Sequence, residues 1–313
     1  MLDQHKIPNE VCLEETNCAN CGSYNEEPFL QSTDRITYLP GLFSIVKCPN
    51  CSLQYLSPRP DSESIGYYYP ESYPHYNKSS ISSTTKKDGL LDRLKPAFKK
   101  IPSIKTGHLL EVGAASGEYL IKMKEMGWQV QGIEFSDYAA SNARDLGLEV
   151  QTGKIEDCSF PKNYFDLIVG WMVVEHLHDP NSFFKDVKSY IKEDGYMVFS
   201  IPDCDSISRK MFGQYCYDIQ LPTHLYHYNS DTITMILKKN GWNVEKIIWQ
   251  NNAMTFLYSL KIWAFEKNHK WLYKLTNLII SSSLFIPIKY LLHYSLGLTK
   301  QSGRMIVWAM KSK

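Results

Sequence analysis

The chain of 313 residues lacks a long apolar run, an apolar N-terminal segment and an excess of charge of one sign. A helix that spans a bilayer needs about 20 consecutive apolar residues. The nearest candidate, 278–298, is interrupted by serines, Pro287, Lys289 and His293, so no transmembrane segment is expected. Residues 1–10 are polar, which predicts no signal peptide and a cytoplasmic protein. A formal net charge of +1 gives no reason to expect a nucleic-acid partner.

Cysteine is sparse except in two pairs. Cys18 and Cys21 form one C-x-x-C pair, and Cys48 and Cys51 form another. Four thiolates with this spacing suit tetrahedral zinc, and a complete set of four leaves no open position for catalysis. Residues 12–60 therefore predict a small ribbon with a structural zinc that supplies folding energy. A redox dithiol and plain surface thiols are the alternatives. A disulfide framework is not expected in a cytoplasmic protein.

The region between the ribbon and residue 105 is predicted to be a connection. Within the ribbon itself, short strands are predicted at 36–39 and 43–47. After the ribbon, the pattern predicts a short helix at 62–69 and a polar linker or lid at 73–87. An amphipathic helix is expected at 88–100. The connection is thus assigned to residues 61–104, and the second domain to 105–313.

From residue 105 onward, predicted strands and helices alternate, which favours an α/β fold with a mostly parallel, doubly wound sheet. The predicted strands are 108–113, 130–135, 148–152, 165–171, 195–201, 243–249 and 304–310. The predicted helices lie near 117–126, 137–146, 181–191 and 230–240. Two segments are additional to this pattern, namely 203–229 and the aromatic-rich 251–301. The latter has helical spacing and is predicted to be a helical insertion that caps the core, with contact to a lipid surface as the alternative.

The most informative stretch runs from His108 to Gly117, where an apolar strand ends in Glu111 and two glycines follow. A strand, a tight turn and a helix start form the place where open α/β sheets bind nucleotide-like ligands. The turn lacks a middle glycine, a Gly-Lys-Ser/Thr ending and any basic residue, so a pyrophosphate is a poor ligand for it. Glu134 ends the next strand, about 20 residues further on, where an acidic residue holds a ribose diol.

These features resemble the class I S-adenosylmethionine-dependent methyltransferases, with Ala115 in place of the middle glycine. The resemblance continues through 153–161, 165–180 and 190–202, and it implies a seven-stranded Rossmann-like sheet whose last strand is antiparallel. It also implies S-adenosylmethionine as the cofactor. The residues expected to bind the cofactor are Glu111, Gly113, Ala114, Ala115, Gly117, Glu134, Phe135, Ile155, Glu156 and Trp171.

Each of these residues has an expected role. Glu111 would hold the methionine ammonium group, and Glu134 would bind both ribose hydroxyls. Phe135 would lie against the adenine, and Ile155 with Glu156 would border its edge. Lys154 stands where the family often has Asp or Asn, so Asp157 is the substitute acceptor for the adenine amino group. The ring of Trp171 would stabilise the sulfonium cation, although packing in the core is an equally weighted alternative.

Methyl transfer to a hydroxyl requires a group that accepts one proton. Pro222-Thr-His-Leu225 fits a turn of the resembled group, which makes His224 the first candidate for the general base. His176 and Tyr217 are further catalytic candidates. A zinc ribbon before such a domain resembles bacterial glycan-modifying enzymes, which implies O-methylation of a sugar or related small molecule in surface-glycan or secondary metabolism. A non-catalytic cofactor-binding module with a docking ribbon, and a protein or nucleic-acid methyltransferase, are the alternatives.

Overall fold

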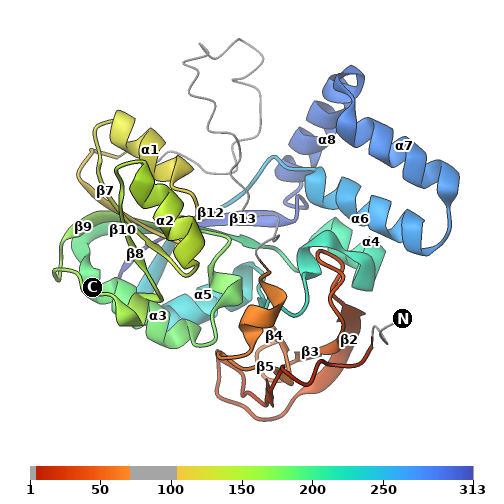
Figure 1. Ribbon diagram of the computed structural model, residues 1–313, viewed down its shortest axis with the longest axis horizontal. Helices are drawn as coiled ribbons and strands as arrows, with labels where there is room; N and C mark the ends of the chain where they lie inside the picture. Colours follow the sequence, from red (N-terminus) through yellow and green to blue (C-terminus); the bar gives the residue numbers. More distant parts are fainter. Residues whose placement is uncertain (1–4, 71–103, 313) are drawn as a thin grey trace.

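The computed structural model of the chain describes residues 5–70 and 104–312 (Figure 1). The predicted linker at 73–87 and the predicted helix at 88–100 lie outside the described residues.

Seven strands form the main sheet, in the order β12–β13–β10–β9–β6–β7–β8 (Figure 1). All of them are parallel except β13, which is antiparallel to both neighbours, as the resemblance implied. The fold class expected from the sequence is therefore confirmed. The strands are β6 His108–Val112, β7 Gln129–Glu134, β8 Glu149–Thr152, β9 Phe165–Trp171, β10 Ile191–Pro202, β12 Trp242–Trp249 and β13 Arg304–Lys311. The strand β10 begins four residues earlier than predicted, with a bulge between Ile191 and Tyr196.

Helices cover both faces of the sheet, because successive strand residues point to opposite faces. Leu109 and Val198 pack with α1 and α2, whereas Leu110 and Phe199 pack in the core that includes α3 and α5. Polar side chains cap three of these helices by accepting bonds from their first free amides. The helices are α1 Glu118–Glu125, α2 Asp137–Asp145, α3 Pro180–Tyr190 and α5 Ser230–Lys239, and the three caps are Ser136, Asp179 and Asn229.

The ribbon contains short strands, but one of the two predicted strands is wrong. The strands are β1 Leu13–Glu14, β2 Glu27–Thr33, β3 Leu42–Lys47, β4 Gln54–Leu56 and β5 Arg59–Pro60. Residues 36–39, predicted as a strand, form a turn instead. The Asp34 carboxylate accepts bonds from the amides of Ile36, Thr37 and Leu39, at 2.8 to 3.2 Å. This side chain takes the amides that a strand partner would otherwise bind.

The ribbon shares a sheet with the second domain. The short strand β11 (Tyr226–His227) pairs antiparallel with β4, which gives a four-stranded sheet in the order β11–β4–β3–β2. The Arg59 guanidinium also donates to the Tyr226 hydroxyl at 3.2 Å. Buried ribbon residues such as Phe43 and Tyr55 belong to the same apolar core as Leu110 and Phe199 of the main sheet. The ribbon is therefore packed against the second domain rather than tethered to it.

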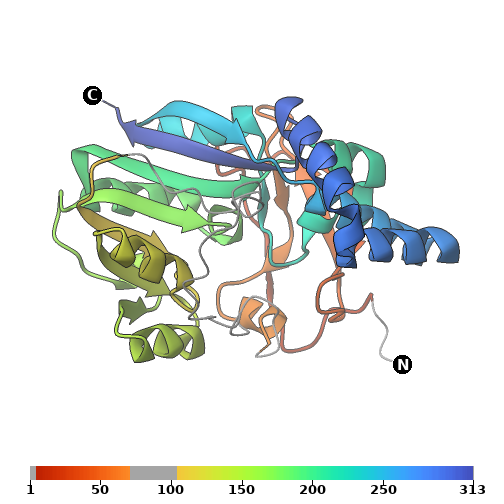
Figure 2. The same ribbon diagram turned by 90° about the horizontal axis from the view of Figure 1, so that it is seen from above.

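The segment between β12 and β13 forms a lobe of three helices, α6 Met254–Glu266, α7 Lys270–Ser281 and α8 Ile286–Leu298. Figures 1 and 2 show this lobe at one end of the sheet, far from the C-terminus. The helix α6 packs on α4 (Ile207–Phe212), where the rings of Phe256 and Phe212 lie 5.3 Å apart. Only the inner helix of the lobe is thus strongly packed on the body of the protein.

The predicted helix at 62–69 is a shorter 3-10 helix, Ile65–Tyr68.

Candidate functional site

The glycine turn, residues 113–117, follows β6 at the carboxyl edge of the sheet. Gly113, Ala115 and Gly117 have φ angles of 73°, 47° and 80°, a region that L residues rarely adopt. The amides of Gly113 and Ala114 both donate to the Ile133 carbonyl of β7, at 2.8 and 2.9 Å. A Cβ at Gly117 would lie 2.3 Å from Leu148 Cδ1, so glycine is required there for packing as well as for φ.

Glu134 ends β7 and is tied to this turn. Its Oε2 accepts from the Ala115 amide at 2.8 Å, and its Oε1 accepts from the Ser136 amide at 2.9 Å. The side chain is buried, although it lies at a strand end. A carboxylate held rigidly by two amides is oriented in advance for a bidentate contact with a diol. The structure thus brings Glu134 and the glycine turn together.

Other predicted cofactor residues lie on the neighbouring strand ends. The Phe135 side chain is 53% exposed, directly after Glu134. Ile155 is buried and opens a short 3-10 helix, Ile155–Asp157, whereas Glu156 is exposed. The carboxylate of Asp157, the substitute adenine acceptor, already accepts from the Lys154 amide at 3.4 Å. These residues border one edge because β9, β6, β7 and β8 are adjacent in the sheet.

Two further candidates, Glu111 and Trp171, are buried at strand ends. Trp171 ends β9 and packs edge-on against Tyr119 of α1, with ring centroids 5.3 Å apart. Its indole N–H is buried and has no hydrogen-bond partner among the described residues. Glu111 is fully buried beside Tyr119, and burial, followed by the charge of Glu111, raises the pKa of the Tyr119 phenol. The residues at this edge therefore fit a nucleoside ligand that carries polar groups.

The rim turn, residues 172–178, follows β9 and contains the 3-10 helix Val174–His176. It contacts the glycine turn directly, because a Cβ added at Gly113 would lie only 2.6 Å from Val173 Cγ2. The acceptor loop, residues 203–229, lies on the other side of the rim turn. The Leu225 amide donates to the Glu175 carbonyl at 2.8 Å.

The structure brings His176 and His224 together, with ring centroids 4.6 Å apart. His224 Nδ1 lies 2.9 Å from the Asp218 carbonyl, and His176 Nδ1 lies 2.8 Å from the Thr223 carbonyl. A carbonyl can only accept, so each Nδ1 is the donor in these bonds, and a neutral His224 ring keeps Nε2 as a proton acceptor. Burial, and then the charges of His176 and His227, lower the pKa of His224 well below its usual range. His224 is therefore neutral at pH 7.

Glu175 is a site residue that the sequence did not single out. Its side chain is fully buried, and neither carboxylate oxygen has a hydrogen-bond partner among the described residues. Burial raises the pKa of Glu175 to about 8, although the charge of Arg304 opposes this shift. The candidate donor atoms of Glu175, His176 and His224 all lie within 4.8 Å of one another. The carboxyl group and the two imidazole rings thus form one cluster of titratable groups, with no hydrogen bond between Glu175 and either ring in the described structure.

Tyr217, the third catalytic candidate, lies on the lobe side of the acceptor loop. Its ring packs against Tyr258 of α6 at 5.0 Å, and its amide donates to Ser259 Oγ at 2.9 Å. The next residue, Asp218, is buried and forms an ion pair with Arg304 at 3.6 Å. Burial raises the pKa of the Tyr217 phenol, so this side chain is a hydrogen-bond donor and not a base at pH 7. No described contact joins Tyr217 to either histidine ring.

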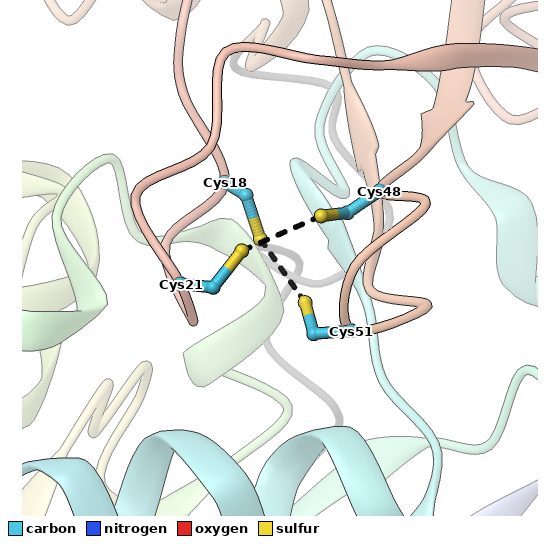
Figure 3. A group of neighbouring side chains, drawn as sticks. All are labelled: Cys18, Cys21, Cys48 and Cys51. Atoms are coloured by element: carbon cyan, nitrogen blue, oxygen red, sulfur yellow. Dashed lines mark hydrogen bonds between the residues drawn. The ribbon is translucent and has the colours of Figure 1, made fainter.

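The four cysteines of the ribbon converge on one point (Figure 3). The sulfur atoms of Cys18 and Cys51 lie 3.3 Å apart, and those of Cys21 and Cys48 lie 3.5 Å apart. These distances exceed the S–S bond of about 2.05 Å and are close to the roughly 3.8 Å edge of a tetrahedron with Zn–S bonds of about 2.3 Å. Gly22 and Ser52 follow the pairs with φ angles of 76° and 63° and close each turn. The donor set fits a structural zinc ion.

A cleft of about 550 Å³ lies between the ribbon, α3 and α5. Arg59, Lys185, Lys239 and Tyr226 are among its lining residues. No residue of the glycine turn, nor Glu134 or Trp171, lines it. This cleft is therefore separate from the proposed cofactor edge.

Comparison with known proteins identifies a family. A family model described as a methyltransferase domain matches residues 84–247, which is more than half of the chain. An uncharacterized protein of Methanocaldococcus jannaschii is 28% identical over 109 residues, which cover 35% of this chain and 51% of that protein. The chain thus matches about half the length of this curated relative.

Several solved structures are also similar. An S-adenosylmethionine-dependent methyltransferase from Mesorhizobium loti is 15% identical, with a TM-score of 0.46, over 67% of this chain and 94% of that one. A possible histamine N-methyltransferase from Thermotoga maritima is 14% identical, with a TM-score of 0.44, over 67% and 84% of the two chains. At these values neither structure bears on the chemistry of this chain.

The cysteine cluster predicts that purified protein contains about one zinc ion per chain by elemental analysis. Cys48→Ser should remove the ion and make the ribbon sensitive to protease, because the cluster closes both turns. Cys12→Ser, which changes an exposed thiol of the ribbon outside the cluster, is the matched control and should keep the ion. A folded, metal-free wild-type protein would contradict the assignment.

Proposed function

The chain belongs to the methyltransferase domain family, whose model matches residues 84–247, and on this premise we propose that it methylates a small-molecule hydroxyl with S-adenosylmethionine as donor. The acceptor we propose is a sugar or a related small molecule of surface-glycan or secondary metabolism. The observation that carries the proposal is the contact between the glycine turn and the rim turn at Gly113 and Val173. It supports the proposal because a nucleoside bound at the glycine turn would lie next to the rim turn that carries Glu175 and His176.

The donor side of the site has few chemical tasks. When bound, S-adenosylmethionine supplies an activated methyl group for an in-line displacement. Glu134, fixed by the Ala115 and Ser136 amides, holds the ribose, and Phe135 covers the base. Glu111 holds the amino-acid end of the donor, and the ring of Trp171 stabilises the sulfonium cation. These residues position the reacting centres, and positioning alone supplies a large part of the rate enhancement.

The acceptor side manages one proton. His224 is neutral and keeps Nε2 free of a proton, because its Nδ1 is committed to the Asp218 carbonyl. A hydroxyl that donates to Nε2 loses its proton as the new O–C bond forms. Glu175, within 4.8 Å of both histidine donor atoms, takes up this proton or stabilises the resulting imidazolium when it is ionised. His176 Nδ1 also lies 2.8 Å from the Tyr69 hydroxyl, which extends the network to the segment after the ribbon.

Aromatic side chains and neutral hydrogen-bonding groups support a sugar-like acceptor. The Tyr69 hydroxyl lies 2.8 Å from His176 Nδ1, and Tyr217, on the lobe side of the acceptor loop, is half-buried. A tyrosine ring with its hydroxyl can bind a molecule that has both an apolar face and polar groups, such as a sugar ring. Beside the loop, the charges of Asp218 and Arg304 neutralise each other in an ion pair. This pair therefore gives no reason to expect a charged acceptor.

Glu134→Ala should weaken binding of S-adenosylmethionine by roughly 1–3 kcal/mol, because it removes charge-assisted bonds to the ribose. Isothermal titration calorimetry measures this change. Glu149→Ala, which changes an exposed carboxylate at the opposite end of the neighbouring strand β8, is the control and should bind normally. Unchanged affinity in Glu134→Ala, with thermal unfolding like that of the wild type, would reject the ribose assignment.

His224→Ala should slow methyl transfer by about 10²-fold or more while donor binding persists, because the proton acceptor is lost. Because the pKa of Glu175 is raised to about 8, the carboxyl group is mostly neutral at pH 7 and ionises as the pH rises past 8. We therefore expect kcat to increase through about pH 8 in the wild type and to lose this increase in Glu175→Gln. A Glu175→Gln profile with the same rise would remove Glu175 from the proton transfer.

The acceptor class is tested by incubating the protein with donor labelled in the methyl group and a panel of nucleotide sugars and glycan extracts. Transfer of alkali-stable label to a sugar hydroxyl is the expected result, and His224→Ala is the matched control. Label found only in added nucleic acid or protein would overturn the acceptor proposal. Donor binding without transfer to any of these acceptors would instead favour a non-catalytic module.

A further inference from the structure

The lobe carries an apolar surface that faces away from the protein. We define the outer surface of the lobe as the exposed apolar side chains of α7, α8 and the turn between them. In α7, Trp271, Leu275 and Leu278 recur at helical spacing, and Trp271 is 68% exposed. In and just before α8, the corresponding side chains are Leu284, Ile288, Leu291 and Leu298. Of these, Leu291 is 73% exposed and Leu298 is 82% exposed.

This surface is exceptional for the molecule. Nearly half of the exposed large hydrophobic side chains of the described residues lie between 265 and 298. The helix α7 buries only Thr276, and α8 buries only His293 and Leu296. Figure 1 shows α7 and α8 on the outer side of the lobe, with α6 between α7 and α4. Clustered exposed apolar side chains of this kind mark an interaction surface.

Charge distinguishes the lobe from the rest of the chain. Residues 251–301 contain six lysines and one acidic residue, Glu266, whereas the whole chain carries a formal charge of only +1. Glu266 lies 3.9 Å from Arg35 and so does not offset the lysines. None of the six lysines forms a salt bridge with a carboxylate among the described residues. The lobe is thus strongly cationic, and the remainder of the chain has a net negative charge.

We propose that the outer surface of the lobe docks on the surface of an anionic lipid bilayer. Exposed leucines and a tryptophan beside lysines are what an interfacial helix presents to lipid headgroups and to the outer part of the acyl chains. Lys270 and Lys274 flank Trp271 in α7, so apolar contact and charge attraction act at the same place. Negative lipids complement the charge of the lobe.

In this proposal the lobe lies in the interface of the bilayer. No single helix among the described residues is long and apolar enough to span; α7 and the segment Ser283–Leu298 pass this test only as a pair, and they meet at a bend of 82°. Helices of 12 and 13 residues are about 18–20 Å long, shorter than the roughly 30 Å hydrocarbon core.

A second copy of the chain is a poorer occupant of this surface. Two copies that met through their lobes would bring twelve lysines and only two acidic residues together, and like charges in contact are destabilising. An anionic bilayer has no such penalty. The inference depends on the lobe alone, so it stands or falls separately from the proposed methyl transfer.

The test is vesicle flotation of the full chain with two kinds of vesicle, phosphatidylcholine alone and phosphatidylcholine with phosphatidylglycerol. We expect binding to the anionic vesicles that is at least about tenfold tighter and that weakens as salt is added. Trp271→Ala combined with Leu291→Ser, and separately Lys270→Glu with Lys274→Glu, should each reduce this affinity by about tenfold or more.

Matched controls change similar side chains elsewhere. Tyr24→Ala with Leu146→Ser removes exposed apolar side chains outside the lobe, and Lys122→Glu with Lys238→Glu reverses exposed lysines of α1 and α5. Both controls should bind the anionic vesicles like the wild type. Thermal unfolding like that of the wild type checks that every variant is folded.

Three results would overturn the proposal. The first is equal or absent binding to the two kinds of vesicle. The second is an equal loss of affinity in the controls and in the lobe variants. The third is a dimer in sedimentation velocity without lipid that Trp271→Ala with Leu291→Ser dissociates, since the surface would then belong to a second copy.

Discussion

The backbone of Leu225 forms hydrogen bonds with two different parts of the protein, and the candidate site depends on both. Its amide donates to the Glu175 carbonyl of the rim turn, and its carbonyl accepts from the Leu56 amide of the ribbon. The next residues, Tyr226 and His227, continue this pairing with β4. The acceptor loop is therefore held between the catalytic sheet and the ribbon, which fixes His224 beside His176. The four cysteines converge in the ribbon on which this loop rests, so the geometry of the candidate site depends on the folding of the ribbon.

Local patterns in the sequence were sufficient for the main sheet. Strand and helix periods and the glycine turn depend on residues that are close in the chain, and the structure contains the elements that they predict. Residues 36–39 show the limit of such patterns. Their composition suits a strand, but the Asp34 carboxylate captures their amides. The pairing of β11 with β4 joins residues about 170 positions apart in the chain. No local sequence pattern predicts such a pairing.

The site was predicted in part. Glu134 and the glycine turn could be found because their spacing is set by one strand and one helix. His176 and His224 were each named, but their contact was not, since it needs the loop to fold back on the rim turn. Glu175 was missed because its importance comes from desolvation, and the letter Glu in a turn carries no sign of burial. Its neighbour in sequence, His176, was the only available hint.

The lobe begins and ends on the same pair of strands. Trp249, at the end of β12, lies opposite Met305, near the start of β13, in the antiparallel register of the last hairpin. Because the chain leaves and rejoins the sheet at neighbouring positions, the connection between β12 and β13 can be a tight turn or an insertion of about fifty residues. The three helices are therefore an insertion between two adjacent strands, and α6 ties this insertion back to α4 and the acceptor loop through Phe256 and Tyr258.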